Sequence, residues 1–176
     1  MAQNSIELFR QFRENEEFIQ LNKPIIIADG LRTPENMGSV LRLAANIGAE
    51  KTIIISDKAA QFKNYKINKT ASGAASKTAW KIIEHYTDLE KEIPDGYKLI
   101  ALETTPDAEN IYSCTFPSKL ALVIGNEVSG ISDELLSQCT SKLYIPIPGP
   151  ISSLNVTHAL SAALFEWMRQ QLYSGK

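Results

Sequence analysis

Residues 24–56, PIIIADGLRTPENMGSVLRLAANIGAEKTIIIS, place a segment with helical spacing between two short apolar runs. The runs at 25–28 and 52–55 are dominated by isoleucine, as is typical of strands buried on both faces of a parallel sheet. Between them, apolar side chains recur every three or four residues from Asn36 and stop at Gly48, a residue type favoured just after a helix end. A strand–helix–strand unit of about 30 residues has parallel strands, so this stretch predicts an α/β fold.

The rest of the chain extends this alternation. We expect further strands at 97–102, 120–124 and 142–145, and helices at 5–20, 132–137 and 154–172. Residues 59–81 give a mixed pattern, with a turn at the small residues 71–76. The predicted architecture is a mostly parallel sheet flanked by helices, with residues 1–22 as an N-terminal helical extension and 23–176 as the main domain.

Length and composition favour one compact domain. The chain has 176 residues, of which 44% are hydrophobic, enough for a single core. No apolar run approaches the roughly 20 residues that span a bilayer, and the charged N-terminus lacks the apolar centre of a signal peptide. Two isolated cysteines do not suggest a disulfide framework. We therefore expect a cytoplasmic protein without a membrane partner.

The net charge of −2 conceals an uneven distribution. Residues 58–81 contain six lysines and no acidic residue, whereas the remainder has 12 basic and 20 acidic residues. Phe62, Tyr65 and Trp80 lie within this basic stretch. Lysines contact phosphates and aromatic rings stack on unpaired bases, so the stretch could bind RNA. Charge alone favours the alternative, a solvated lysine-rich loop and helix.

Common phosphate and metal motifs are missing. The chain has neither the G-x-G-x-x-G pattern of dinucleotide sites nor the G-x-x-x-x-G-K-[ST] pattern of P-loops. His85 and His158, the two histidines, do not have metal-ligand spacing, so no metal is expected. Cys114 and Cys139 fit buried apolar positions better than nucleophilic ones.

Three loops that follow predicted strands are rich in glycine, proline and small polar residues. They span 33–42, 125–130 and 145–157. Ligands of parallel α/β sheets collect outside the carboxyl ends of the strands, so these loops could line one pocket. Ordinary turn and capping chemistry explains each loop equally well when it is taken alone.

Together, the loops resemble the three motifs of the SpoU/TrmH group of the SPOUT superfamily, which are S-adenosylmethionine-dependent RNA 2′-O-ribose methyltransferases. The likeness covers roughly residues 24–172. The matching residues, in order, are Asn36-x-Gly38-x-x-x-Arg42-x-Ala44, Gly125-x-Glu127-x-x-Gly130 and Ile145-Pro146-x-x-Gly149-x-x-x-Ser153-Leu154-Asn155-Val156. The resemblance implies a C-terminal trefoil knot, which departs from the rule that chains are unknotted. It also implies a homodimer with the active site near the interface.

The same resemblance assigns roles to individual residues. It implies that backbone groups of the second and third loops hold S-adenosylmethionine, with these cofactor residues by position: Leu102, Gly125, Ile145, Ser153 and Leu154. Arg42 is the expected catalytic residue, binding an RNA phosphate and stabilising the developing alkoxide, with general-base action as an alternative. Asn36 and Asn155 would orient the ribose, and Glu127 would fix Arg42 or a loop amide.

The expected activity is methylation of a ribose 2′-hydroxyl in tRNA or rRNA. Lys63, Lys66 and Lys69 are the expected RNA contacts outside the pocket. Two alternatives stay open at this point. One is a catalytically inactive RNA-binding protein of the same fold, and the other is a methyltransferase for a small molecule or a protein.

Overall fold

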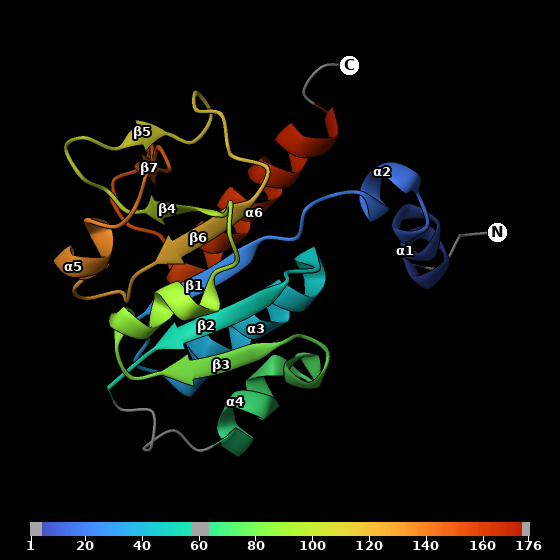
Figure 1. Ribbon diagram of the computed structural model, residues 1–176, viewed down its shortest axis with the longest axis horizontal. Helices are drawn as coiled ribbons and strands as arrows, with labels where there is room; N and C mark the ends of the chain where they lie inside the picture. The colour runs from blue at the N-terminus through green and yellow to red at the C-terminus, as the bar shows by residue number, and fades with distance from the viewer. Residues whose placement is uncertain (1–4, 58–63, 174–176) are drawn as a thin grey trace.

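Seven parallel strands form one sheet in the order β3-β2-β1-β6-β4-β7-β5 (Figure 1). The computed structural model describes residues 5–57 and 64–173. The prediction of an α/β fold with a parallel sheet flanked by helices is confirmed. Within the described residues, no helix is both long and apolar enough to cross a membrane.

After a short helical N-terminus, helices and strands alternate except from β4 to β6, where three strands follow one another. In chain order they are α1 Ser5–Arg13, α2 Glu16–Ile19, β1 Ile25–Asp29, α3 Pro34–Ile47, β2 Lys51–Ile55, α4 Asn64–Ala71, the 3-10 turn η2 Ala74–Ser76, β3 Trp80–Ile83, the 3-10 segment η3 Tyr86–Glu92, β4 Lys98–Leu102, β5 Glu109–Asn110, β6 Leu120–Ile124, α5 Asp133–Leu136, β7 Ser141–Tyr144 and α6 Val156–Tyr173.

The strand–helix–strand unit forms as its sequence predicts. The Thr33 hydroxyl accepts a hydrogen bond from the Asn36 N–H at 3.2 Å and so caps α3, which starts at Pro34, two residues earlier than predicted. Gly48 ends the helix with a φ of +70°, a conformation that costs glycine little. β1 and β2 then pair in parallel, from Ile25 with Lys51 onward.

The two faces of β1 belong to two different cores. Ile26 and Ala28 face the core that α3, α4 and α6 cover. Ile25 and Ile27 face the core that includes residues of η3 and α5. All four residues are fully buried, which is why this strand is a continuous apolar run rather than an alternating one.

The C-terminal helix α6 packs one face against the core of the same chain. Leu160, Leu164 and Trp167 of α6 are fully buried among residues of the first core. The Trp167 indole N–H donates to the Pro117 carbonyl at 3.0 Å. Gln170 accepts from the Phe116 N–H at 2.9 Å, so α6 is held against the connection between β4 and β6. Core packing within one subunit therefore accounts for these three apolar residues of the helix.

Some elements differ from the predictions. The prediction of a single helix over 5–20 is wrong, because this stretch forms the two helices α1 and α2. The Asn15 side chain accepts from the Glu17 N–H and so caps the start of α2. The predictions missed β3, a partly exposed strand, and β5, which has two residues. Helix α4 falls in the stretch with no clear pattern.

A close approach of two helices explains the glycine of the first loop. At Gly38 of α3, a Cβ atom would lie 2.6 Å from the Thr70 Cβ and 2.8 Å from the Ile67 carbonyl oxygen, both on α4. These distances are too short for any side chain. Gly38 therefore sets how closely α4 lies against α3.

We predict that Gly38→Ala destabilises the protein by about 1–3 kcal/mol, although alanine is the better helix former. The added methyl group meets the backbone of α4, which must shift. Gly149→Ala is the matched control, since no heavy atom lies within 4 Å of its would-be Cβ. Urea denaturation measures both free energies of unfolding. An unchanged or raised stability of Gly38→Ala would contradict the close contact.

Candidate active site

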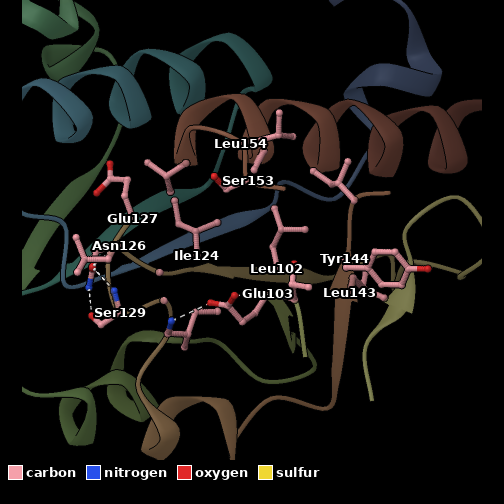
Figure 2. Close-up of a pocket in the computed structure, with 18 of the residues that line it drawn as sticks. Leu102, Glu103, Ile124, Asn126, Glu127, Ser129, Leu143, Tyr144, Ser153 and Leu154 are labelled. Atoms are coloured by element: carbon pink, nitrogen blue, oxygen red, sulfur yellow. Dashed lines mark hydrogen bonds between the residues drawn. The ribbon is translucent and has the colours of Figure 1, made fainter. Parts of the chain in front are cut away.

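The carboxyl ends of the central strands meet at one edge of the sheet, and a cavity of about 520 Å³ lies there. Residues from the ends of β4, β6 and β7, and from the segment before α6, line it (Figure 2). Parallel pairing brings these ends together because β6 lies between β1 and β4, and β7 lies on the other side of β4. The second and third of the expected loops, 125–130 and 145–157, contribute to the cavity lining, whereas no residue of the first loop, 33–42, does.

All of the predicted cofactor residues line this cavity. They come from four separate segments of the chain, and in sequence order they are Leu102, Gly125, Ile145, Ser153 and Leu154. Gly125 is buried, whereas Ser153 and Leu154 are exposed at the mouth. The structure thus places side by side five residues that are spread over more than 50 positions of sequence.

The loop after β6 is closed by contacts between its own main-chain atoms beside the cavity. A Cβ at Gly125 would lie 2.1 Å from the Gly130 carbonyl carbon, so only glycine fits there. Asn126 and Gly130 exchange backbone hydrogen bonds of 3.2 and 3.0 Å and close the loop. The Asn126 side chain accepts from the N–H groups of Val128 and Ser129 at 2.9 Å each. The result is a rigid cradle of main-chain atoms beside the cavity.

Two carboxylates hold the far end of this loop, and the sequence predictions missed both. Glu103, just after β4, accepts from the Ile131 N–H at 3.0 Å. Asp29, at the end of β1, accepts from the Ser132 N–H at 2.8 Å and from its hydroxyl at 2.7 Å. Ser132 occupies the N-cap position of α5, but its hydroxyl donates to Asp29 instead of accepting from the helix. The signal in the sequence was the position of each acid at a strand end.

A hydrogen bond joins the first loop to the second. The Asn36 side-chain amide donates to the Glu127 carboxylate, with Asn36 on the first turn of α3 and Glu127 on the loop after β6. Of the partners expected for Glu127, neither Arg42 nor a loop amide is the one found; the partner is Asn36. Glu127 lines the cavity and Asn36 lies beside it.

Arg42 lies on the exposed surface of α3, one turn beyond Gly38. Among the described residues no carboxylate lies within salt-bridge distance of it, so the alternative of a helix-surface ion pair is not formed there. Arg42 does not line the cavity. Its guanidinium is therefore available to an external anion on the same helix that carries Asn36.

The Asn155 side chain forms hydrogen bonds with its own local segment of the chain. Its side-chain oxygen accepts from the Thr157 N–H at 2.9 Å and from the Thr157 hydroxyl at 2.6 Å, at the start of α6. This is the capping role that the sequence left open. The residue is exposed next to Leu154 and Val156, which line the cavity, without lining it itself.

Of the lysines predicted to contact RNA, the two that the structure describes lie on one helix. Lys66 and Lys69 are exposed on α4, whereas Lys63 lies outside the described residues. Lys81, from the same basic stretch, instead forms a 2.7 Å ion pair with Glu92. Because α4 packs on α3 at Gly38, its exposed lysines belong to the same helical layer as Arg42.

The cysteines are poor candidates for nucleophiles. Burial raises the pKa of the Cys139 thiol to about 11, and burial likewise raises the pKa of Cys114, with the Glu109 charge adding to the shift. At neutral pH both are thiols. Among the described residues, no group of three or more His, Cys, Asp or Glu side chains could hold a metal ion.

Comparison with known proteins gives one consistent family. The SpoU rRNA Methylase family matches residues 23–165. The 23S rRNA (guanosine-2′-O-)-methyltransferase RlmB of Haemophilus influenzae is 31% identical over 174 residues, which cover 96% of this chain and 70% of the relative. The protein of the same name from Xanthomonas axonopodis pv. citri is 34% identical over 152 residues. That match covers 84% of this chain but 59% of the relative, so this chain spans only part of it.

Solved structures agree on the fold. The A. aeolicus TrmH/SpoU tRNA modifying enzyme superposes with a TM-score of 0.77 at 22% identity, over 96% of this chain and 86% of that one. A chain from a study of "2-OH methylation of C/U34 on tRNA" gives a TM-score of 0.75 at 24% identity, over 88% of this chain and 99% of the other. These neighbours imply the SPOUT knot at the C-terminus, in line with the expectation from the motifs.

The order of the strands, the cavity at their carboxyl ends and the match over residues 23–165 lead to one assignment: the chain belongs to the SpoU rRNA methylase family.

Proposed function

We propose that this protein uses S-adenosylmethionine to methylate the 2′-hydroxyl of a ribose in tRNA or rRNA. The observation that carries the proposal is the gathering of all the predicted cofactor residues around one cavity. The family match and the relatives named as rRNA ribose methyltransferases support it. A catalytically inactive RNA-binding protein of the same fold is the alternative that the tests below must exclude.

The cavity fits a nucleoside cofactor. Gly125 and Gly130 line it, so main-chain N–H and C=O groups of this loop can reach the edge of an adenine. Leu102 and Leu154 supply apolar contact. When bound, S-adenosylmethionine supplies an electrophilic methyl group. The residues of this chain have the separate task of holding that group in line with the ribose oxygen, because positioning accounts for much of the acceleration.

Arg42 is the proposed catalytic residue. An arginine stays protonated, so it binds an RNA phosphate with two parallel hydrogen bonds and stabilises the negative charge that develops on the 2′-oxygen. Its exposure on α3 leaves it open to RNA. The Asn36–Glu127 hydrogen bond fixes the first turn of the same helix to the cofactor loop, and Asn155 shapes the start of α6.

We further propose that residues 23–176 form the methyltransferase domain, preceded by a helical extension, and that two copies form a homodimer. In a dimer, Arg42 of one subunit could complete the cavity of the other, which would account for its position outside the cavity wall. Lys66 and Lys69 would then extend the RNA surface from Arg42 along α4.

Cofactor binding gives the first test. Isothermal titration should show that the protein binds S-adenosylmethionine and that Gly125→Ala binds it at least about tenfold more weakly. The added methyl group clashes with the Gly130 backbone and so changes the shape of the loop. Circular dichroism checks that the variant is folded. A folded wild-type protein that does not bind the cofactor would establish the inactive alternative.

Methyl transfer gives the second test. With radiolabelled S-adenosylmethionine, total RNA should acquire label and small metabolites should not. Arg42→Ala should lose at least about 100-fold in rate while it keeps its fold and its cofactor affinity, because the guanidinium acts on the RNA side of the reaction. Asn46→Ala, one turn further along α3 and also exposed, is the control. Normal methylation by Arg42→Ala would refute the catalytic role.

RNA binding gives the third test. The double variant Lys66→Gln/Lys69→Gln should weaken RNA binding and lower the slope of log K against log salt by about 1–2, because two phosphate contacts are lost. The control is Lys98→Gln/Lys119→Gln, which removes the same charge from exposed lysines at the amino ends of β4 and β6. Equal effects from both pairs would mean that α4 is not a specific RNA surface.

A further inference from the structure

The charged residues that line the cavity all carry the same sign among the described residues. Among the described residues that line it, Glu103, Glu127 and Asp133 are acidic and none is basic. Glu127 and Asp133 are exposed, so water screens their charge, and Glu127 already accepts from Asn36. Glu103 is half-buried at the end of β4, where screening is weaker. Its charge therefore acts on the cavity most strongly.

The Glu103 carboxylate is held in place by two backbone groups. Oε1 accepts from the Thr104 N–H at 3.0 Å, and Oε2 accepts from the Ile131 N–H at 3.0 Å (Figure 2). Gly130, at a φ of +67°, leaves the space that the carboxylate fills: a Cβ there would lie 2.4 Å from Oε2. The side chain can hardly swing away toward solvent without breaking these contacts.

Among the described residues, no cation neutralises the Glu103 carboxylate. Within residues 5–57 and 64–173, no Lys, Arg or His lies within salt-bridge distance of Glu103. Neutral amides hold it, so the full negative charge remains beside the cavity. A fixed charge in partly buried surroundings favours a cation and gives no such advantage to a neutral molecule of the same shape.

We propose that Glu103 makes the cofactor site selective for charge, so that it retains the cationic sulfonium cofactor and releases the neutral thioether product. This inference rests on the proposed function. In the transfer, the bond from sulfur to the methyl carbon breaks and its electron pair stays on sulfur. A lone pair of the 2′-oxygen forms the new bond to carbon, and the hydroxyl proton leaves to solvent. The cofactor thus loses its sulfonium charge at the moment when it must be exchanged.

The affinity ratio of two ligands separates this electrostatic role from a structural one. If Glu103 only held the loop, its replacement would weaken S-adenosylmethionine and S-adenosylhomocysteine equally. If it selects for charge, Glu103→Gln should lower the preference for S-adenosylmethionine over S-adenosylhomocysteine by about three- to tenfold. Sinefungin, which carries an ammonium group near the position of the sulfonium, should follow S-adenosylmethionine.

Isothermal titration of the full chain with the three ligands makes the measurement. Glu134→Gln, an exposed acid on α5 that does not line the cavity, is the matched control and should leave the ratio unchanged. Glu103→Asp keeps the charge on a shorter side chain, so it should retain most of the preference even if all three affinities fall. This second variant also covers the case in which Glu103→Gln folds poorly.

The outcomes distinguish this inference from the proposed function. A wild-type protein that binds none of the three ligands would overturn the proposed function and, with it, this inference. Binding of all three with the same ratio in wild type and Glu103→Gln would overturn only the inference. A preference for S-adenosylmethionine that falls in Glu103→Gln but is largely kept in Glu103→Asp would establish it.

Discussion

The insertion of β6 between β1 and β4 is the constraint on which the site depends. All five residues of β6 are buried, and the strand pairs in parallel with both neighbours. The register brings Ile124 beside Ala28 on one side and Leu102 on the other. The chain that leaves β6 at Gly125 therefore emerges between two other strand ends, and the cavity forms where it turns.

The strand ends also explain how such a tight turn is stabilised. The contact of Gly125 with the Gly130 backbone leaves no room for side chains inside the loop, so the N–H groups that follow it need outside partners. Glu103 and Asp29 supply them, one from each strand that flanks β6. The sheet thus determines the shape of the loop through hydrogen bonds as well as through the direction of the chain.

The elements that sequence predicted best are those with continuous apolar runs. The unit from Ile25 to Ile55 could be recognised because burial on both faces of a sheet leaves a plain pattern. The cavity-lining residues were found through motif resemblance rather than through periodicity. The short strands β3 and β5 escaped because edge strands of two to four residues carry little pattern.

The sequence places Glu103 and Asp29 at strand ends but does not show what they bind, since their partners lie 28 and 103 residues further along the chain. Arg42 could be placed on its helix, whereas Asn155 lies just before α6 and not within it as predicted. Only the structure separates both residues from the cavity wall. The limit on what the sequence predicts therefore has a physical cause. Local patterns give the elements, whereas long-range hydrogen bonds decide which side chains meet.

The position of β1 has a consequence for the newly made chain. Ile25 pairs with Lys51 on one side and with Ala121 on the other, so one edge of β1 is completed early and the other late. While the ribosome adds the residues between β2 and β6, that second edge is an apolar strand without its partner, a template for pairing with foreign chains. The order of synthesis thus leaves one edge of β1, an inner strand of the finished sheet, unpaired until β6 is made.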